Sequence, residues 1–132
     1  SNYSSEAQLR AGVDRVMESL RSTPGVEQAG AGSHLPLSTG YNDSVIVAEG
    51  YAMKPGESAI SPISMRVTPG YLESLDIHPV EGRLFDARDA GGAQRVIIVD
   101  ERLAKRFWPG QSAIGRQMFF PGSGPKDRLT VV

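Results

Sequence analysis

The chain has 132 residues, of which 39% are hydrophobic, and it contains no cysteine. A chain of this length buries roughly two thirds of the surface that its unfolded form exposes, so it can hold a core without disulfide bonds. Lysine and arginine number 14 against 15 aspartates and glutamates, a net charge of −1, which argues against the broad basic face that nucleic-acid binding requires. No apolar run approaches the ~20 residues that span a bilayer. The sequence therefore predicts one domain or part of one.

The two ends of the sequence suggest a fragment of a longer protein. Ser1-Asn2 is typical of the remnant of a cleaved expression tag. Val131-Val132 ends the sequence in the middle of an apolar run, where a natural domain rarely stops. We therefore expect residues 1–132 to be a single domain excised from a larger chain.

The first predicted element is a helix over residues 9–20, where the apolar residues recur on one stripe. Ser5 and Gln8 fit a capping box at its start. Pro24-Gly25 should end the helix. Small residues at alternate positions then predict a weak strand over residues 26–33 that packs closely against another segment.

The middle of the chain alternates predicted loops and strands. A polar loop is expected over residues 34–42, and a strand over residues 44–49. Lys54 lies at the tip of the next loop, residues 51–58. Ile63, Met65 and Val67 alternate with polar residues, which predicts a strand with one buried face.

Proline-glycine pairs occur at five places, and most of them predict turns, because proline fixes φ and glycine accepts a positive φ. We expect an exception at Pro69, which can occupy the first position of a short helix over residues 68–75. Thr68 would be the N-cap of that helix. Residues 77–85 should then run extended, and residues 86–94 should form a charged surface loop.

The clearest pattern lies between residues 95 and 120. The apolar run at residues 95–99 predicts a central strand covered on both faces. Asp100 should cap a helix that ends near Phe107, because Trp108 precedes Pro109 and helical ψ is disfavoured there. The last two strands are expected over residues 117–120 and 129–132.

Residues with catalytic or metal-binding potential do not gather into a recognisable site. His34 and His78 each stand without an acidic or histidine partner at ligand spacing, so both are interpreted as loop histidines. Asp86 and Asp89 are interpreted as residues of a solvated loop, and Glu101 as first-turn support for the capped helix. The glycine-rich stretches match no dinucleotide fingerprint. We therefore predict no catalytic residue, no cofactor and no metal.

Two apolar features have competing interpretations. Phe107 and Trp108 are the largest aromatic pair, and we expect a core anchor rather than an exposed interaction anchor. Leu35-Pro36-Leu37 lies in a segment too short and broken for a strand. Its leucines either fold back as a plug or project as a contact surface for a partner.

Two long motifs carry a resemblance to a known family. VTPGYLESLDIHPVEGRLFD (residues 67–86) and RVIIVDERLAKRFWPGQSAIGRQMFF (residues 95–120) occur in the order found there. The chain resembles the MacB-like periplasmic core domain of FtsX-like ABC-transporter permeases, most closely the duplicated permeases of acidobacteria. Asp100 stands where asparagine is usual, and both residues cap helices well. The matching positions include Pro69, Gly70, Tyr71, Gly82, Arg83, Asp100, Phe107, Trp108, Pro109, Gly110 and Gly115.

The resemblance implies a periplasmic location, on the outer face of the bacterial inner membrane, and a mechanical role. In that family the domain moves with ATP hydrolysis that occurs in a separate domain or subunit. The implied partners are the permease's transmembrane helices, that ATPase and a possible periplasmic adaptor. The resemblance also implies a divergent, β-rich middle lobe at residues 35–63.

These arguments combine into one prediction of fold and function. We expect an α+β two-layer sandwich, in which a mixed or antiparallel sheet carries the helices at residues 9–20 and 101–107 on one face. Its function would be to transmit conformational change without catalysis. Leu35, Pro36, Leu37 and Lys54 would contact partners. The alternatives are a small-ligand-sensing module with an apolar cleft, and a hydrolase with a serine or carboxylate beside one histidine.

Overall fold

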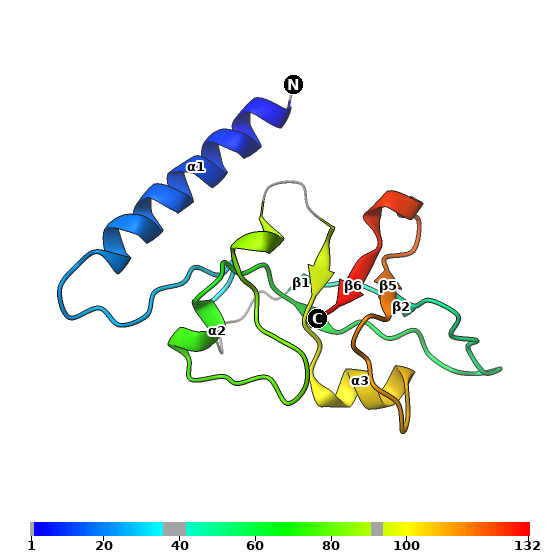
Figure 1. Cartoon of the computed structure of the whole chain (residues 1–132). Helices are drawn as coiled ribbons and strands as arrows, with labels where there is room; N and C mark the ends of the chain where they lie inside the picture. The colour runs from blue at the N-terminus through cyan, green and yellow to red at the C-terminus, as the bar shows by residue number, and fades with distance from the viewer. Residues whose placement is uncertain (1, 36–41, 91–93) are drawn as a thin grey trace.

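A mixed four-stranded sheet forms the centre of the computed structural model, which describes residues 2–35, 42–90 and 94–132. The strand order is β2-β5-β6-β4. Strand β5 pairs antiparallel with both of its neighbours, and β4 pairs parallel with β6 (Figure 1). The predicted α+β class is confirmed. The strands are β2 (Val47–Ala48), β4 (Val96–Ile97), β5 (Gln117–Phe119) and β6 (Leu129–Val131).

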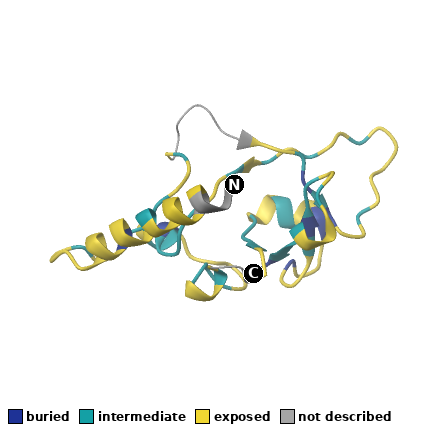
Figure 2. Ribbon diagram, turned by 90° about the horizontal axis from the view of Figure 1, so that it is seen from above, coloured by how far each residue is buried: buried dark blue, intermediate teal, exposed yellow. Residues whose placement is uncertain are grey.

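The core lies between this sheet and helix α3 (Glu101–Phe107). Side chains alternate across a strand, so Met118 of β5 and Val131 of β6 point toward α3 and are 0% and 2% exposed. Phe107 and Trp108 close the other side of this cluster. Figure 2 shows that the buried residues concentrate around the sheet. The strands predicted at residues 117–120 and 129–132 are confirmed to within one residue.

Helix α1 (Asn2–Arg21) extends away from the sheet (Figure 1), so the prediction that it packs there is wrong. Most of its apolar stripe faces solvent, since Leu9 is 70% exposed and Val16 is 55% exposed, whereas Met17 near its C-terminal end is buried at 7% exposure. The side chain of Arg21 donates a 2.8 Å hydrogen bond to the carbonyl of Pro69, which holds the end of α1 beside the 68–71 segment instead of the sheet. Ser5 lies inside α1 and is not its N-cap.

A second, two-stranded sheet pairs β1 (Asn42–Asp43) with β3 (Ile63–Ser64). The predicted buried face of the second strand is wrong, because Ile63 is 63% exposed and Met65 is 38% exposed. Alternation predicts a buried face only where another layer covers it, and no described segment buries these two side chains. The segment at residues 26–33 forms only an isolated antiparallel bridge, from Gly32 to Val67.

All five proline-glycine pairs form turns, including the pair expected to start a helix. In each turn the N–H after the glycine donates to the carbonyl before the proline, at 3.0–3.2 Å. Gly70 has φ +90°, which a helix cannot continue, so α2 (Tyr71–Ser74) begins one residue later without a side-chain cap. The hydroxyl of Thr68 instead accepts a hydrogen bond from the Ala31 N–H at 2.8 Å.

One further prediction near the sheet needs correction. Strand β4 lies at the edge of the described sheet, and Val96–Ile97 are only half-buried, so it is not a central strand. Within the 35–63 segment, β2 belongs to the main sheet and β1 to the two-stranded sheet, and the middle lobe stays a prediction. Residues 86–94 include a short 3₁₀ helix, η1 (Ala87–Asp89), and a second one, η2 (Pro125–Asp127), precedes β6.

Within the described residues, no helix is long and apolar enough to cross a membrane.

Candidate interaction surface

The turn at residues 54–57 is fastened to α3 by one carboxylate. Glu57 accepts hydrogen bonds from the Tyr51 hydroxyl at 2.6 Å and from the Arg106 guanidinium at 2.8 Å, both on Oε1. Its other oxygen accepts from the Lys54 N–H at 2.8 Å. The Glu57 side chain is only 9% exposed. These bonds, the Tyr51 hydroxyl first, lower the pKa of Glu57, and the same contact raises the pKa of Tyr51.

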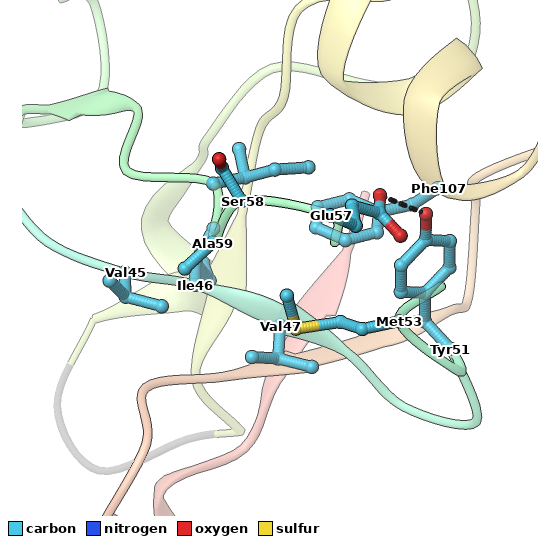
Figure 3. Close-up of a pocket in the computed structure, with 10 residues that line it drawn as sticks. Val45, Ile46, Val47, Tyr51, Met53, Glu57, Ser58, Ala59 and Phe107 are labelled. Atoms are coloured by element: carbon cyan, nitrogen blue, oxygen red, sulfur yellow. Dashed lines mark hydrogen bonds between the residues drawn. The ribbon is translucent and has the colours of Figure 1, made fainter. Parts of the chain in front are cut away.

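We call the hydrogen-bonded group of Tyr51, Glu57 and Arg106 the clasp. An apolar wall lies beside it (Figure 3). The Tyr51 ring meets the Phe107 ring edge-on, with centroids 5.1 Å apart. Met53 is 49% exposed on the same side. The cavity that they line with Val45 and Val47 is about 20 Å³, space for roughly one water molecule. The surface is therefore a shallow apolar dimple next to a charged turn.

Lys54 and Leu35 both lie on the surface, as expected of contact residues. Lys54 is exposed, and the turn that carries it is closed by the Glu57 N–H donating to the Lys54 carbonyl at 3.0 Å. Leu35 is 76% exposed, which disfavours the plug interpretation for that leucine. Pro36 and Leu37 lie outside the described residues.

Helix α3 follows the local rules read from the sequence. Asp100 is its N-cap, and the carboxylate accepts a hydrogen bond from the Leu103 N–H at 2.8 Å. Trp108 is the C-cap, with its N–H donating to the Ala104 carbonyl at 2.8 Å. Trp108 is 7% exposed, so the prediction of a core anchor is confirmed. The following pair, Pro109-Gly110, forms the turn that leaves the helix.

Several glycines of the two motifs lie where segments meet. A Cβ at Gly70 would lie 2.5 Å from the Ala29 carbonyl oxygen. A Cβ at Gly82 would lie 2.7 Å from the carbonyl carbon of Val132. Gly115 has φ +79° and donates its N–H to the Val131 carbonyl at 2.8 Å. Tyr71, which is 8% exposed, packs against the 29–32 segment, so these motif positions lie where segments of the chain meet.

Arg83 and Asp89 form a two-pronged ion pair with N–O distances of 2.7 and 2.8 Å. The Asp89 side chain is 11% exposed, so the interpretation of a solvated loop is wrong for this residue. Asp86 and Asp89 form a capping box around η1, which explains why the segment folds over them. The Arg83 contact lowers the pKa of Asp89, and the Arg88 contact lowers the pKa of Asp86.

Each histidine has a polar neighbour, but only His78 contradicts the interpretation that neither has an acidic or histidine partner. His78 contacts the carboxylate of Asp76 at 2.9 Å, and Asp76 has a positive φ of 56°. His34 contacts Ser33 at 2.9 Å. Catalysis would need a nucleophile, a base and an orienting group together, and within the described residues neither histidine has both partners. The same residues contain no cluster of three metal-ligating side chains.

Sequence reasoning missed three members of the clasp: Tyr51, Glu57 and Arg106. A local signal existed, because a carboxylate three residues after Lys54 can accept its N–H across the turn. The contact to Arg106 spans 49 residues, and no local pattern predicts it.

The molecule is an α+β domain with a projecting helix α1, a capped helix α3 and a turn at residues 54–57 that is joined to α3 by an ion pair (Figure 1).

Comparison with known proteins assigns the chain to a family. Residues 6–132 match the model of the MacB-like periplasmic core domain. The chain therefore belongs to the family of MacB-like periplasmic core domains, which are the periplasmic part of ABC-transporter permeases. The resemblance read from the two motifs is confirmed, whereas the acidobacterial grouping stays a prediction.

One solved structure supports the fold. The crystal structure of the periplasmic region of MacB from Actinobacillus actinomycetemcomitans matches with a TM-score of 0.59 at 14% identity, and the match covers 88% of this chain and 46% of that one. At this identity the likeness concerns the fold alone, and the chain spans under half of that region. No curated protein sequence matches the chain.

Proposed function

We propose that this chain is a non-catalytic domain that transmits movement from the transmembrane helices of an ABC-transporter permease to a periplasmic partner. Membership of the MacB-like periplasmic core domains carries this proposal. The ATP would be hydrolysed in a separate domain or subunit. The chain's own contribution would be to move as a unit and to present contact residues, Leu35 and Lys54 among them.

The junction at the end of α1 supports a lever role. Arg21 donates hydrogen bonds to the carbonyls of Pro69, at 2.8 Å, and Ala29, at 3.4 Å. A Cβ at Gly30 would lie 2.2 Å from the Tyr71 backbone, so the two segments that Arg21 joins, at residues 29–30 and 69–71, are packed closely against each other. A displacement of the 20-residue α1 would therefore be passed to the 68–71 turn rather than absorbed at the joint.

Distance measurements in the full transporter would test the lever. The chain contains no cysteine, so Ala11→Cys on α1 and Ala52→Cys near the 54–57 turn can carry a pair of spin labels once any cysteines elsewhere in the transporter are replaced. We expect the distance between these two labels to stay the same in the ATP-bound and nucleotide-free transporter, because the domain moves as a unit. The distance from the Ala52→Cys label to a label on a transmembrane helix of the permease should change between the two states, and a transporter whose ATPase cannot bind nucleotide is the control. A distance to the transmembrane helix that is identical in all states would contradict transmission through this domain.

Absence of catalysis has its own test. The purified chain should show no turnover of peptide or ester substrates above the level of its His34→Ala and His78→Ala variants. Turnover that either substitution abolishes would overturn the non-catalytic part of the proposal.

Small-ligand sensing is a second candidate, favoured by one cleft. A cleft of about 270 Å³ lies between the 67–69 segment, Phe85 and the β4–β6 edge of the sheet, close to the lower limit of about 300 Å³ for ligand pockets. Binding of a small apolar molecule there would raise the melting temperature of the wild type and not that of a Val96→Asp variant.

A further inference from the structure

A strip of cationic side chains runs along one side of α3 and onto the neighbouring turn. Arg106 contacts Glu57 of the 54–57 turn at 2.8 Å. Arg102 precedes Arg106 by four residues, so both guanidinium groups lie on the same side of the helix. Lys54 begins the turn that Arg106 touches. We call Lys54, Arg102, Lys105 and Arg106 the basic strip.

Part of this positive charge is not neutralised within the domain. Arg106 is paired with Glu57, and Lys105 is paired with Glu101 at 3.7 Å. Lys54 and Arg102 are exposed, and neither has an ion pair in the part of the chain that the structure describes. The nearby carboxylate of Asp100 is engaged as the N-cap of α3. The strip is therefore cationic on a chain whose net charge is −1.

The backbone of the turn that carries Lys54 is held against α3 before any partner arrives. Glu57 ties the 54–57 turn to α3 by accepting a hydrogen bond from Arg106, and it also accepts hydrogen bonds from the Tyr51 hydroxyl and from the Lys54 N–H. A group fixed in its bound position loses little conformational entropy on binding. The Lys54 backbone thus keeps its place relative to Arg106.

An apolar contact lies directly beside the charges. Met53 precedes Lys54 and is 49% exposed, and Figure 3 shows it next to Val47 on the wall of the dimple. The dimple's volume of about 20 Å³ admits a methyl-sized group. An acyl chain would need a far larger groove, so the dimple suits an aliphatic side chain better than a lipid.

We propose that the basic strip and Met53 form a docking site for an acidic, extended segment of a periplasmic protein that carries a small aliphatic residue between its carboxylates. The carboxylates would contact Lys54 and Arg102, and the aliphatic residue would contact Met53. This inference rests on the proposed function, because it names the chemistry of the partner that the 54–57 turn contacts.

Binding of synthetic peptides to the purified chain tests the proposal. The probe is a fluorescein-labelled Glu-Asp-Val-Asp-Glu peptide, and Glu-Asp-Ser-Asp-Glu is the version without the aliphatic side chain. The double variant Lys54→Glu with Arg102→Glu should weaken binding of the probe by at least about tenfold, and added salt should weaken binding to the wild type. The serine peptide should bind more weakly than the valine peptide to the wild type, and Met53→Ser should reduce that difference.

A matched control separates a docking site from general charge attraction. Arg10→Glu with Arg15→Glu changes the net charge of the chain equally, but on exposed positions of α1, and should leave binding unchanged. An equal loss in both double variants would overturn the proposal, as would no binding of the probe. Binding to phosphatidylglycerol vesicles but not to the peptide would overturn it in favour of a membrane surface. Circular dichroism checks that each variant is folded.

Failure here is distinguishable from failure of the proposed function. If the peptide does not bind but the distance from the label near the turn to the transmembrane helix still responds to nucleotide, the lever stands and only the partner's chemistry is wrong. If the peptide binds but no distance responds, the docking site stands without a lever.

Discussion

Replacing Gly30 with alanine should destabilise the domain strongly. A Cβ at Gly30 would lie 2.2 Å from both the Cα and the amide nitrogen of Tyr71, and backbone atoms cannot swing aside as a side chain can. Overpacking of this kind costs about 1–3 kcal/mol and occasionally more. Separating the segments would also stretch the 2.8 Å hydrogen bond from the Ala31 N–H to the Thr68 hydroxyl. Such a bond contributes about 0.5–1.5 kcal/mol, so we expect the free energy of unfolding to fall by about 2–4 kcal/mol.

Gly124 provides the matched control for this substitution. Its φ is −76°, which alanine adopts freely. The nearest atom to an added Cβ would be the Asp127 carboxylate oxygen at 3.8 Å, an ordinary contact. Gly124→Ala should therefore change the free energy of unfolding by less than about 1 kcal/mol, toward stabilisation.

Urea unfolding measures both differences, followed by the fluorescence of Trp108, the single tryptophan. If Gly30→Ala is as stable as Gly124→Ala, the 30 and 71 backbones do not touch. The rigid junction at the end of α1, and with it the structural support for the lever, would then be refuted.

Trp108→Ala should lower the free energy of unfolding by about 3–5 kcal/mol, because the side chain is 7% exposed; a loss under about 1 kcal/mol in urea unfolding followed by circular dichroism would mean that the ring is exposed. Gly82→Ala should cost at least about 1–3 kcal/mol in the same assay, since its Cβ would meet Val132 at 2.7 Å and φ is +79°. Asp89 has a lowered pKa, so its stabilising contact with Arg83 is present above the ordinary value of 3.8 and is lost as the pH falls below it. The melting temperature of Asp89→Asn should therefore depend less on acid pH than that of the wild type, and parallel curves would contradict this.

Local rules were sufficient for the segment from Asp100 to Gly110. A carboxylate before a helical stripe caps the helix, and a residue before proline ends it, whatever lies elsewhere in the chain. The structure has both features at the predicted residues. The turns at the proline-glycine pairs were likewise predictable from adjacent residues. The one pair predicted to start a helix, Pro69-Gly70, forms a turn instead, because Gly70 takes a positive φ.

Long-range placement could not be read in the same way. The apolar stripe of α1 predicts that something covers it, but not what, and the sheet does not do so in this structure. The alternation at Ile63 and Met65 likewise predicts a buried face but not the segment that would cover it, and both side chains are exposed. In the candidate site, the exposure of Lys54 followed from its turn, whereas the clasp depends on an Arg106 contact between residues 49 positions apart.

The motif residues and the basic strip should respond differently to substitution, and the difference separates scaffold from function. Gly70 and Gly82 lie where an added Cβ would strike the backbone of another segment. Replacing either should lower stability before it changes any contact with a partner. Arg102 is exposed and forms no ion pair within the part of the chain that the structure describes, so its replacement should alter partner binding at nearly constant stability. The motif glycines lie where segments of the chain meet, and the proposed partner-binding residues of the basic strip lie elsewhere. The same family motif is therefore compatible with different partners.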